Sequence, residues 1–579
     1  MKPQHQPALQ QAFTTQAALG RRQMLGRTLA LGALGTVGAA LPGCGGSGGG
    51  NRVQSAADQL PALARSLLQT TGVPGLAWAV VHGGQTIAAQ GLGVCRAGGS
   101  QAVDADTVFE LASVSKPLAA TVVARQVGEG RVAWDTPLHQ LLPGFALSDP
   151  ATTAQVTVGD MFAHRSGLPD HAGDLLEELG YSQREVLERL RLLLVKPLRS
   201  SYAYTNEGFT AGAIGVAQAV GADWATLSRQ SLYAPLGMAR TTSVYAEFMA
   251  QANRAVGHVR ADDGSWRPGL PRNADPQSPA GGASSSVNDM ARWLALLLAQ
   301  GRWQGASLIA PSALQPMWQP QAPGGAYGYG FNVGAIESGL ALFSHSGAFM
   351  LGAATCFMLV PALDVAIVAL TNGIPIGVPE TLCRQFLDLA ESGRISRDWW
   401  ATYSKALAPI LAPTGSLVGK QPPSPAVPGG PLAQYAGSYG NAYYGPLQVD
   451  VVGDALQLTL GPVRHVACAA PHWIAANPMA LEPEALSQAP VLTAGVSGRS
   501  LRLAAYRGSE RREVALEPTL TSENFQFLHQ AVDAGLGIGL LPDYVVAADV
   551  AAGRLGLLLT DWRLSIFGTH MVVLHMPDR

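Results

Sequence analysis

A serine and a lysine that could act together chemically lie three residues apart in the segment FELASVSKPLAATVV, as Ser113 and Lys116. Lysine occurs at only five positions in the chain, and this is its only Ser-x-x-Lys. If Ser113 opens a helix, the two side chains share one face, so the lysine Nζ can reach the serine Oγ. Pro117 supports this placement, because proline is tolerated near the start of a helix.

A serine hydroxyl becomes an effective nucleophile only when a neighbouring base accepts its proton. A helix N-terminus also stabilises the oxyanion that forms during acyl transfer. Ser113 and Lys116 therefore suit an acylated serine and its base. The spacing alone does not exclude a surface serine beside a surface lysine, so other parts of the sequence must decide between the two.

Two triplets further along the chain could complete such a site. They are Tyr204-Thr205-Asn206 in SYAYTNEGF and His345-Ser346-Gly347 in FSHSGAFMLG. Each pattern has a second match, Tyr439-Gly440-Asn441 and His82-Gly83-Gly84, but these fall in a separate β-rich region and in a hairpin turn. Only the Tyr204 and His345 triplets follow the Ser113–Lys116 pair in order within one domain, with flanking residues that suit an active site.

The chain resembles the serine hydrolases related to class C β-lactamases, D-alanyl-D-alanine peptidases and the esterases that share their fold. The resemblance runs from about residue 56 to 394 and is carried by FELASVSK, MFAHRSGLPD, YTNEGF, PAGGASSSVNDMARWL, YGYGF and HSG. It implies an α+β fold, in which an antiparallel sheet is flanked by helices and joined to a helical subdomain. The active site is then expected between the sheet and that subdomain.

The resemblance makes Ser113 the acylated nucleophile and lets Lys116 and Tyr204 share the role of base. Asn206 would position either the substrate amide or the lysine ammonium, and the backbone N–H groups of Ser113 and Ala348 would form the oxyanion hole. Lowering a tyrosine pKa from about 10 to 7 needs about 4 kcal/mol. An ammonium at about 4 Å supplies about that much at an effective dielectric near 20. A neutral lysine could equally take the proton, and the sequence leaves both alternatives open.

The third motif departs from the β-lactamase pattern, in which a lysine meets the carboxylate of the antibiotic. Here His345, which we expect to be mostly neutral at pH 7, precedes Gly347. Histidine at this position is more typical of the peptidase and esterase members. We therefore expect hydrolysis of a carboxylic ester or a D-amino-acid peptide or amide. The alternatives are a β-lactamase and a non-catalytic penicillin- or peptidoglycan-binding protein.

We expect no cofactor and no metal. His164 and His171 flank HRSGLPDH, but two histidines in one loop are weak evidence for a metal site. No Cys-x-x-Cys pair occurs, so Cys95, Cys356, Cys383 and Cys468 are expected to be buried thiols.

Composition limits the remaining classes. The chain has 579 residues, which suggests two to four domains, and it is 47% hydrophobic and 13% charged, as globular proteins are. The net charge of −2 offers no basic field for a phosphate backbone, so nucleic acid is not an expected partner.

Residues 1–50 are predicted to be an export signal and a Gly/Ser tether. Arg21 and Arg22 precede an apolar run, residues 28–40, that is too short to span a bilayer and resembles a twin-arginine signal. We expect a periplasmic protein. LPGC resembles a lipoprotein box with Cys44 as the lipidated residue and membrane anchor. Pro42 is unusual there, and the alternative is simple cleavage after the small residues.

The predicted catalytic domain, residues 51–395, has strands at both ends and helices between. Periodicity predicts helices at residues 60–72, 115–127, 184–195 and 287–300, the last with Ser286 as N-cap. Strand pairs are predicted at residues 75–94 and 352–373. One sheet should therefore draw its edges from both ends of the domain.

The remaining chain is predicted to hold a Pro/Gly linker at residues 396–431, a small antiparallel β domain at 432–516 and a short α/β tail at 517–579. The β domain resembles the lipocalin-like C-terminal domain of some peptidases of this family, at YAGSYGNAYYGPLQV, and suggests assembly into a homo-oligomer or substrate gating. The tail resembles the end of the effector-binding domain of LysR-type regulators, at AGLGIGLLPDYVVAADVAAGRL. We expect the tail to be a fusion remnant without a catalytic role.

Overall fold

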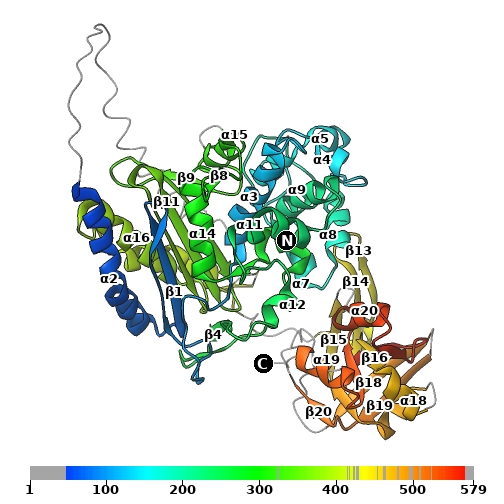
Figure 1. Ribbon diagram of the computed structural model, residues 1–579. Helices are drawn as coiled ribbons and strands as arrows, with labels where there is room; N and C mark the ends of the chain where they lie inside the picture. Colours follow the sequence, from blue (N-terminus) through cyan, green and yellow to red (C-terminus); the bar gives the residue numbers. More distant parts are fainter. Residues whose placement is uncertain are drawn as a thin grey trace, which may run out of the picture. The chain divides into compact units, whose positions relative to one another are not determined.

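The computed structural model describes residues 47–566, apart from short gaps at residues 323–324, 414, 416, 422–423, 425–428, 453, 461–464, 479–481, 494–499, 508–509 and 523–524. The predicted export signal and Cys44 lie outside the described residues. The chain forms two compact units (Figure 1). The catalytic unit holds residues up to 174 and 183–418, and the C-terminal unit holds residues 175–182 and 419 onward.

A six-stranded sheet forms the centre of the catalytic unit, in the order β2-β1-β12-β11-β10-β9. The strands are β1 Gly75–His82, β2 Gln85–Gly93, β9 Asn332–Ala335, β10 Ala341–Phe349, β11 Ala353–Val360 and β12 Val365–Thr371. Strand β1 pairs antiparallel with β12, so the two ends of the domain meet in one sheet as predicted.

Both faces of this sheet are covered, which explains why β11 and β12 read as continuous apolar runs. Alternate residues of β12 enter different cores. Ala366, Val368 and Leu370 pack into the core on one face, whereas Val365 and Ile367 pack into the core on the other. Helices α2 and α16 contact the sheet on this second face, and α14 contacts β1 and β12 (Figure 1).

The helices and minor strand pairs of the catalytic unit complete its two layers and the helical subdomain. The helices are α2 Ser47–Thr71, α3 Ser115–Gly128, α4 Leu138–Leu141, α5 Pro150–Gln155, α6 Val158–Phe162, α8 Gln183–Arg189, α9 Asn206–Ala219, α10 Trp224–Ser228, α11 Ala234–Leu236, α12 Tyr245–Met249, α13 Ser278–Gly281, α14 Val287–Leu298, α15 Pro311–Leu314, α16 Val378–Ser392 and α17 Trp399–Leu407. Helix α7 Asp174–Glu178 begins in this unit at Asp174, and its other residues belong to the C-terminal unit. The minor pairs are β3 Phe109–Glu110 with β6 Ser284–Ser285, β4 His258–Arg260 with β5 Trp266–Pro268, and β7 Arg302–Trp303 with β8 Ala306–Ser307.

Several element boundaries differ from the sequence predictions. Helix α2 begins at Ser47, inside the predicted tether, and α17 lies inside the predicted linker, where its Trp399 donates to Asp388 of α16 at 2.7 Å. Helix α8 ends at Arg189 and continues as a short 3₁₀ turn, so the predicted helix at 184–195 is too long. The N-cap of α14 is as predicted, since Ser286 accepts from the backbone of Asp289.

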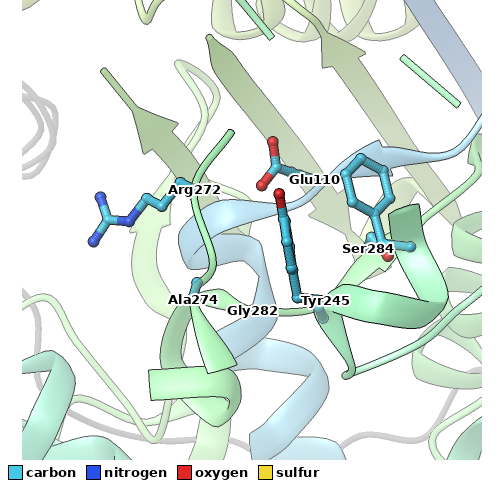
Figure 2. Close-up of a pocket in the computed structure, with 9 residues that line it drawn as sticks. Glu110, Tyr245, Arg272, Ala274, Gly282 and Ser284 are labelled. Atoms are coloured by element: carbon cyan, nitrogen blue, oxygen red, sulfur yellow. The ribbon is translucent and has the colours of Figure 1, made fainter. Parts of the chain in front are cut away.

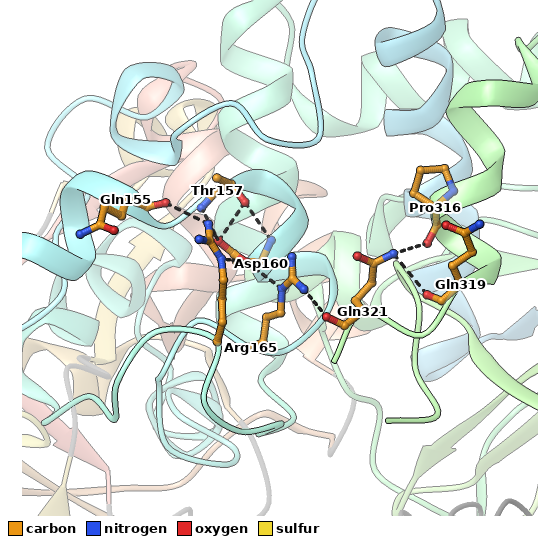
Figure 3. A network of polar contacts seen from close by, with 8 residues as sticks. Gln155, Thr157, Asp160, Arg165, Pro316, Gln319 and Gln321 are labelled. Atoms are coloured by element: carbon orange, nitrogen blue, oxygen red, sulfur yellow. Dashed lines mark hydrogen bonds and ion pairs between the residues drawn. The ribbon is translucent and has the colours of Figure 1, made fainter. Parts of the chain in front are cut away.

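A buried carboxylate, Asp160 on α6, ties together the loops of the helical subdomain (Figure 3). It caps α6 through Thr157 and accepts hydrogen bonds from Arg165 at 2.7 Å and from Arg199 at 2.7 and 2.9 Å. Burial raises its pKa, but the bonds from Arg199 and Thr157 outweigh burial and hold the pKa below its usual value. Arg165 also donates to the carbonyl of Gln321. The loop from residue 163 to 171 is thereby fixed at its start.

The described residues of the C-terminal unit form two sheets. Strands β13 Gly437–Asn441, β14 Gly445–Val452 and β15 Ala455–Leu460 form an antiparallel meander. The larger sheet contains β16 His465–Ala469, β17 Val491–Thr493, β18 Leu501–Arg507, β19 Glu510–Leu516, β20 Leu520–Thr521, β21 Ile538–Pro542, β22 Gly556–Leu558 and β23 Arg563–Ile566. Helices α18 Pro471–Ala476, α19 Phe525–Asp533 and α20 Asp543–Ala551 accompany it. The tail predicted at 517–579 holds α19, β21, α20, β22 and β23 among its described residues, so it is α/β as predicted.

The larger sheet joins segments that the sequence assigned to different domains. Strand β16 pairs with β21, and β18 pairs with both β19 and β23. The boundary predicted between residues 516 and 517 therefore falls inside one sheet. Within the part of the chain that the structure describes, no helix combines the length and apolar character needed to cross a membrane.

Candidate active site

Ser113 lies in a 3₁₀ turn, Ala112–Val114, that leads directly into α3. Sequence reasoning placed it at a helix start, and the structure agrees. The preceding residue, Ala112, has φ +46°, which an alanine adopts only at a cost of about 1–3 kcal/mol. Its side chain packs against Ala274, Phe349 and Ala353, which hold this conformation. The turn thus presents the serine in a fixed direction.

Lys116 is fully buried and has three oxygen neighbours. Its Nζ lies 3.2 Å from Ser113 Oγ, 2.6 Å from Asn206 Oδ1 and 2.9 Å from the carbonyl oxygen of Ala280. Burial lowers its pKa from 10.5 to about 7, although Asp174 and Glu207 oppose that shift. A neutral amine donates two hydrogen bonds, which Asn206 and Ala280 can accept, and its lone pair then faces the serine hydroxyl.

Tyr204 approaches the nucleophile from the helical subdomain. Its hydroxyl donates to Ser113 Oγ at 2.8 Å, and Lys116 Nζ lies 4.5 Å from its ring centroid. Burial raises the tyrosine pKa well above its usual value; the hydrogen bond to Ser113 only partly offsets this, and Asp174 and Asp170 raise the pKa further. The phenol therefore stays protonated at neutral pH. Of the two bases that the sequence left open, these pKa shifts favour Lys116.

The backbone around Tyr204 is held by the loop that carries the HRSGLPDH motif. Its N–H donates to Asp170 at 2.8 Å, and its carbonyl accepts from the N–H of His171 at 2.7 Å. His164 accepts from the N–H of Thr205 at 3.2 Å. Both histidines adopt positive φ values, +54° and +57°, at the two ends of the loop. These histidines therefore serve to position Tyr204.

Asn206 contacts Lys116 and also links the lysine to an acid that sequence analysis did not identify. Its side-chain NH₂ donates to the carboxylate of Asp174 at 3.1 and 3.2 Å, and that carboxylate also bonds His171 Nδ1 at 2.7 Å. The amide is thus fixed with its oxygen toward Lys116. Of the two roles expected for Asn206, the contacts match positioning of the lysine. The aspartate is the first residue of α7, three residues after HRSGLPDH, but no spacing rule marks it.

His345 lies on β10 with both ring nitrogens bonded. Nδ1 donates to the carbonyl of Ser346 at 2.7 Å, so Nε2 accepts from the hydroxyl of Tyr327 at 2.9 Å. Burial and, to a smaller extent, the nearby Lys116 lower the pKa of His345 to about 3. The ring is therefore neutral, as expected from its type. Tyr327 belongs to the quoted YGYGF segment, which could have pointed to it.

Gly347 is the point at which β10 meets the turn that carries the nucleophile. A Cβ atom there would lie 2.2 Å from the carbonyl oxygen of Leu111 and 3.0 Å from the nitrogen of Ser113. Only glycine permits this approach. Ala348, the next residue of β10, is the second donor predicted for the oxyanion hole, and the close approach is consistent with that prediction.

The structure brings Ser113, Lys116, Tyr204 and Asn206 into direct contact and places Gly347 beside the serine backbone. A serine that touches a buried amine of lowered pKa and a phenol is equipped for covalent acyl transfer. The cysteines Cys95, Cys356, Cys383 and Cys468 are buried free thiols, as expected, and are not among these contacts.

The family follows from a match to the model described as "Beta-lactamase", which covers residues 60–390. The chain belongs to this beta-lactamase family of serine hydrolases, which includes esterases, D-alanyl-D-alanine peptidases and β-lactamases. A second match, to the LysR substrate binding domain, covers residues 454–576 and so includes every strand given above for the larger C-terminal sheet.

Two relatives and one solved structure illustrate how similar the chain is to known proteins. Unguisins hydrolase ungD' of Aspergillus campestris is 25% identical over 67% of this chain and 76% of its own length. Esterase EstB of Burkholderia gladioli is 34% identical over 28% of this chain and 44% of its own length. The octameric penicillin-binding protein homologue from Pyrococcus abyssi matches 69% of this chain and 87% of its own, with a TM-score of 0.52 and 19% identity, and so shows a shared fold.

Proposed function

We propose that the protein hydrolyses carboxylic esters, or peptides and amides of D-amino acids, through an acyl-enzyme on Ser113. The observation that carries this proposal is the placement of the buried Lys116 amine, 3.2 Å from the serine oxygen, with two other acceptors for its hydrogens. In the first step, Ser113 Oγ attacks the substrate carbonyl and its proton passes to Lys116 Nζ.

Lys116 then donates this proton to the departing alcohol or amine of the substrate. The Tyr204 hydroxyl is bonded to Ser113 Oγ during this step, and its ring lies beside Lys116 Nζ. The backbone N–H groups of Ser113 and Ala348 are proposed to stabilise the oxyanion of each tetrahedral intermediate. Water attacks the acyl-enzyme in the second half of the reaction, with Lys116 again accepting a proton. His345 is neutral and bonded to Tyr327, so it offers no fixed positive charge for a substrate carboxylate.

A fluorophosphonate probe tests the nucleophile directly. We expect the probe to label Ser113, found by peptide mass spectrometry, and to abolish hydrolysis of p-nitrophenyl acetate. Ser113→Ala should lose both labelling and turnover while its circular dichroism spectrum stays unchanged. A folded protein that binds penicillin but is neither labelled nor active would instead favour the binding protein.

Substrate class is tested by comparing chromogenic substrates. Since His345 lacks a charge, we expect nitrocefin turnover to be slow compared with ester turnover. Fast nitrocefin hydrolysis would favour a β-lactamase.

We also propose that the chain is exported to the periplasm, on the basis of Arg21, Arg22 and the apolar run that follows them. Mass spectrometry of the mature N-terminus would identify cleavage, and palmitate incorporation that is lost in Cys44→Ser would identify lipidation.

A further inference from the structure

A small pocket is lined in part by the strand that precedes the nucleophile, and it takes no part in the chemistry described above. Its lining comes from β3, α12, the loop before α13 and the segment that follows it: Glu110, Tyr245, Phe248, Arg272, Ala274, Gly281, Gly282, Ala283 and Ser284 (Figure 2). The space between these residues is about 230 Å³, including some that is open to solvent. Only a small part of this space is enclosed, with room for about one water-sized group, so the pocket suits a single end group.

The walls of the pocket are continuous with the catalytic residues. Glu110 precedes Ser113 by three residues, and Gly281 follows Ala280, whose carbonyl binds Lys116. Ala274 packs with Ala112 and Phe349, which are the neighbours of Ser113 and Ala348 in the chain. The pocket therefore borders the chain segments that carry the nucleophile and the carbonyl partner of Lys116.

Two polar side chains of the pocket lack a hydrogen bond among the described residues. The carboxylate of Glu110 has none, and Ser284 Oγ has none although Ser284 is only 2% exposed. The backbone of Ser284 is fixed by paired hydrogen bonds with Thr242, so its hydroxyl cannot turn away by a small backbone shift. A buried hydroxyl without a partner costs about 1–3 kcal/mol, which a bound ligand would recover.

Among the described residues, the neighbouring side chains form no hydrogen bond with Glu110 or with the hydroxyl of Ser284. Figure 2 shows the hydroxyl of Tyr245 and the carboxylate of Glu110 pointing toward one another, while the guanidinium of Arg272 points away. Arg272 stacks on the ring of Phe349 at 4.5 Å, and Arg254 stacks on Phe248 at 5.7 Å. Burial raises the pKa of Glu110 to about 7, and the two arginines limit that rise. A cation entering the pocket would stabilise the ionised carboxylate.

We propose that this pocket binds a primary ammonium group of the substrate, with Glu110 and Ser284 as its acceptors. An ammonium has three donors in a compact head group, and the carboxylate and the hydroxyl accept two of them in a space of matching size. The inference rests on the proposed function, because it assigns the substrate class of that same site: esters or amides of amino acids that carry a free amine.

The test uses the full-length protein and three p-nitrophenyl esters, of glycine, β-alanine and 6-aminohexanoate. Each is paired with the ester that has a methyl group in place of the ammonium: propionate, butyrate and heptanoate. The measured quantity is the ratio of kcat/KM for the amine ester to that for its partner. For at least one chain length we expect a ratio of about 10 or more, since a site built for a polar group discriminates strongly against its absence.

Glu110→Gln should lower that ratio about tenfold or more, and Ser284→Ala should lower it about threefold. Glu129→Gln, an exposed carboxylate at the far end of α3 that pairs with Arg125, is the matched control and should leave the ratio unchanged. Labelling of Ser113 by the fluorophosphonate counts the folded active sites in each variant. If Glu110→Gln does not fold, Ser284→Ala alone decides.

The outcomes separate this inference from the proposed function. A labelled, active esterase with ratios near one at every chain length would overturn the ammonium site and leave the hydrolase in place. Ratios that stay high in both Glu110→Gln and Ser284→Ala would likewise refute the pocket. Absence of both labelling and ester hydrolysis would refute the proposed function itself.

Discussion

The two units of this protein share the same kind of apolar core but treat charge in opposite ways. Each packs buried strands against helices, for example around Trp78 in the catalytic unit and Leu503 in the C-terminal unit. In the catalytic unit, charged and titratable side chains such as Lys116 and Glu207 are completely buried near Ser113. In the C-terminal unit, the ion pairs of Arg507 and Arg512 lie at the surface beside Trp562.

This difference indicates which unit does chemistry. Burying a charge is costly unless partners compensate it, and the cost appears as shifted pKa values. Lys116 and Tyr204 carry such shifts and contact the serine, and the pKa of His345 is lowered by burial and by Lys116. The ion pairs at the surface of the C-terminal unit remain in contact with water, so their effect on stability is small.

The largest effect should come from Lys116→Ala. Loss of the base is expected to lower kcat/KM for p-nitrophenyl acetate by about 10³–10⁴-fold, in the upper part of the range for general-base removal. Lys405→Ala, on the exposed side of α17, serves as the control and should not change it. Loss of activity smaller than tenfold in a folded Lys116 variant would remove the lysine from the mechanism.

The pH dependence of kcat/KM should report the ionisation of Lys116. Because the pKa of Lys116 is lowered to about 7 and the neutral amine is the active form, kcat/KM should rise about tenfold per pH unit below pH 7 and level off above it. The measurement is the pH dependence of ester hydrolysis, corrected for spontaneous hydrolysis. A profile that stays flat from pH 5 to 8 would contradict a lysine base.

Tyr204→Phe should cost less, about 10–10²-fold, because it removes a hydrogen bond to Ser113 Oγ but not the base. The acid limb near pH 7 should persist in this variant, since it belongs to the lysine. A loss as large as that of Lys116→Ala would make the phenol a partner in proton transfer. A loss below threefold would leave it no role in the chemical step.

Asp160→Asn tests whether buried charge also stabilises the catalytic unit. We expect a loss of about 1–3 kcal/mol in the free energy of unfolding, since Arg165 and Arg199 keep partial access to water. The lowered pKa of Asp160 means that its contribution is present above about pH 4 and is lost as the pH falls further. Urea melts at pH 7 and pH 3.5 should therefore show a difference that shrinks in acid. Exposed Asp263→Asn is the control.

The smallest effect on activity should come from deleting residues 519–579, which we expect to change specific esterase activity by less than about threefold. The same deletion should destabilise the C-terminal unit, because it removes β21 and β23, the partners of β16 and β18. Limited proteolysis would report that loss. A large fall in activity would show that the C-terminal unit takes part in catalysis, and would contradict the difference drawn here between the two units.

The sequence by itself predicted the serine, lysine and tyrosine that the structure brings into contact, and the strands at both ends of the catalytic domain. Tyr204 was predicted from the resemblance to a family, whereas the other features depend on short-range geometry. A spacing of three residues places Ser113 and Lys116 on one helix face, and alternation or continuous apolar runs mark β1, β11 and β12. Each can be read from fewer than fifteen neighbouring residues.

Only the tertiary structure revealed the hydrogen-bond partners of Lys116 and the direction in which the pKa values of Lys116 and Tyr204 are shifted. The carbonyl of Ala280 binds Lys116 from 164 residues away, and a backbone oxygen has no residue type that a sequence could show. Asp174 reaches the lysine through Asn206, which no spacing rule predicts. Burial, which exists only after packing, lowers the pKa of Lys116 and raises that of Tyr204, and so favours the lysine as the base.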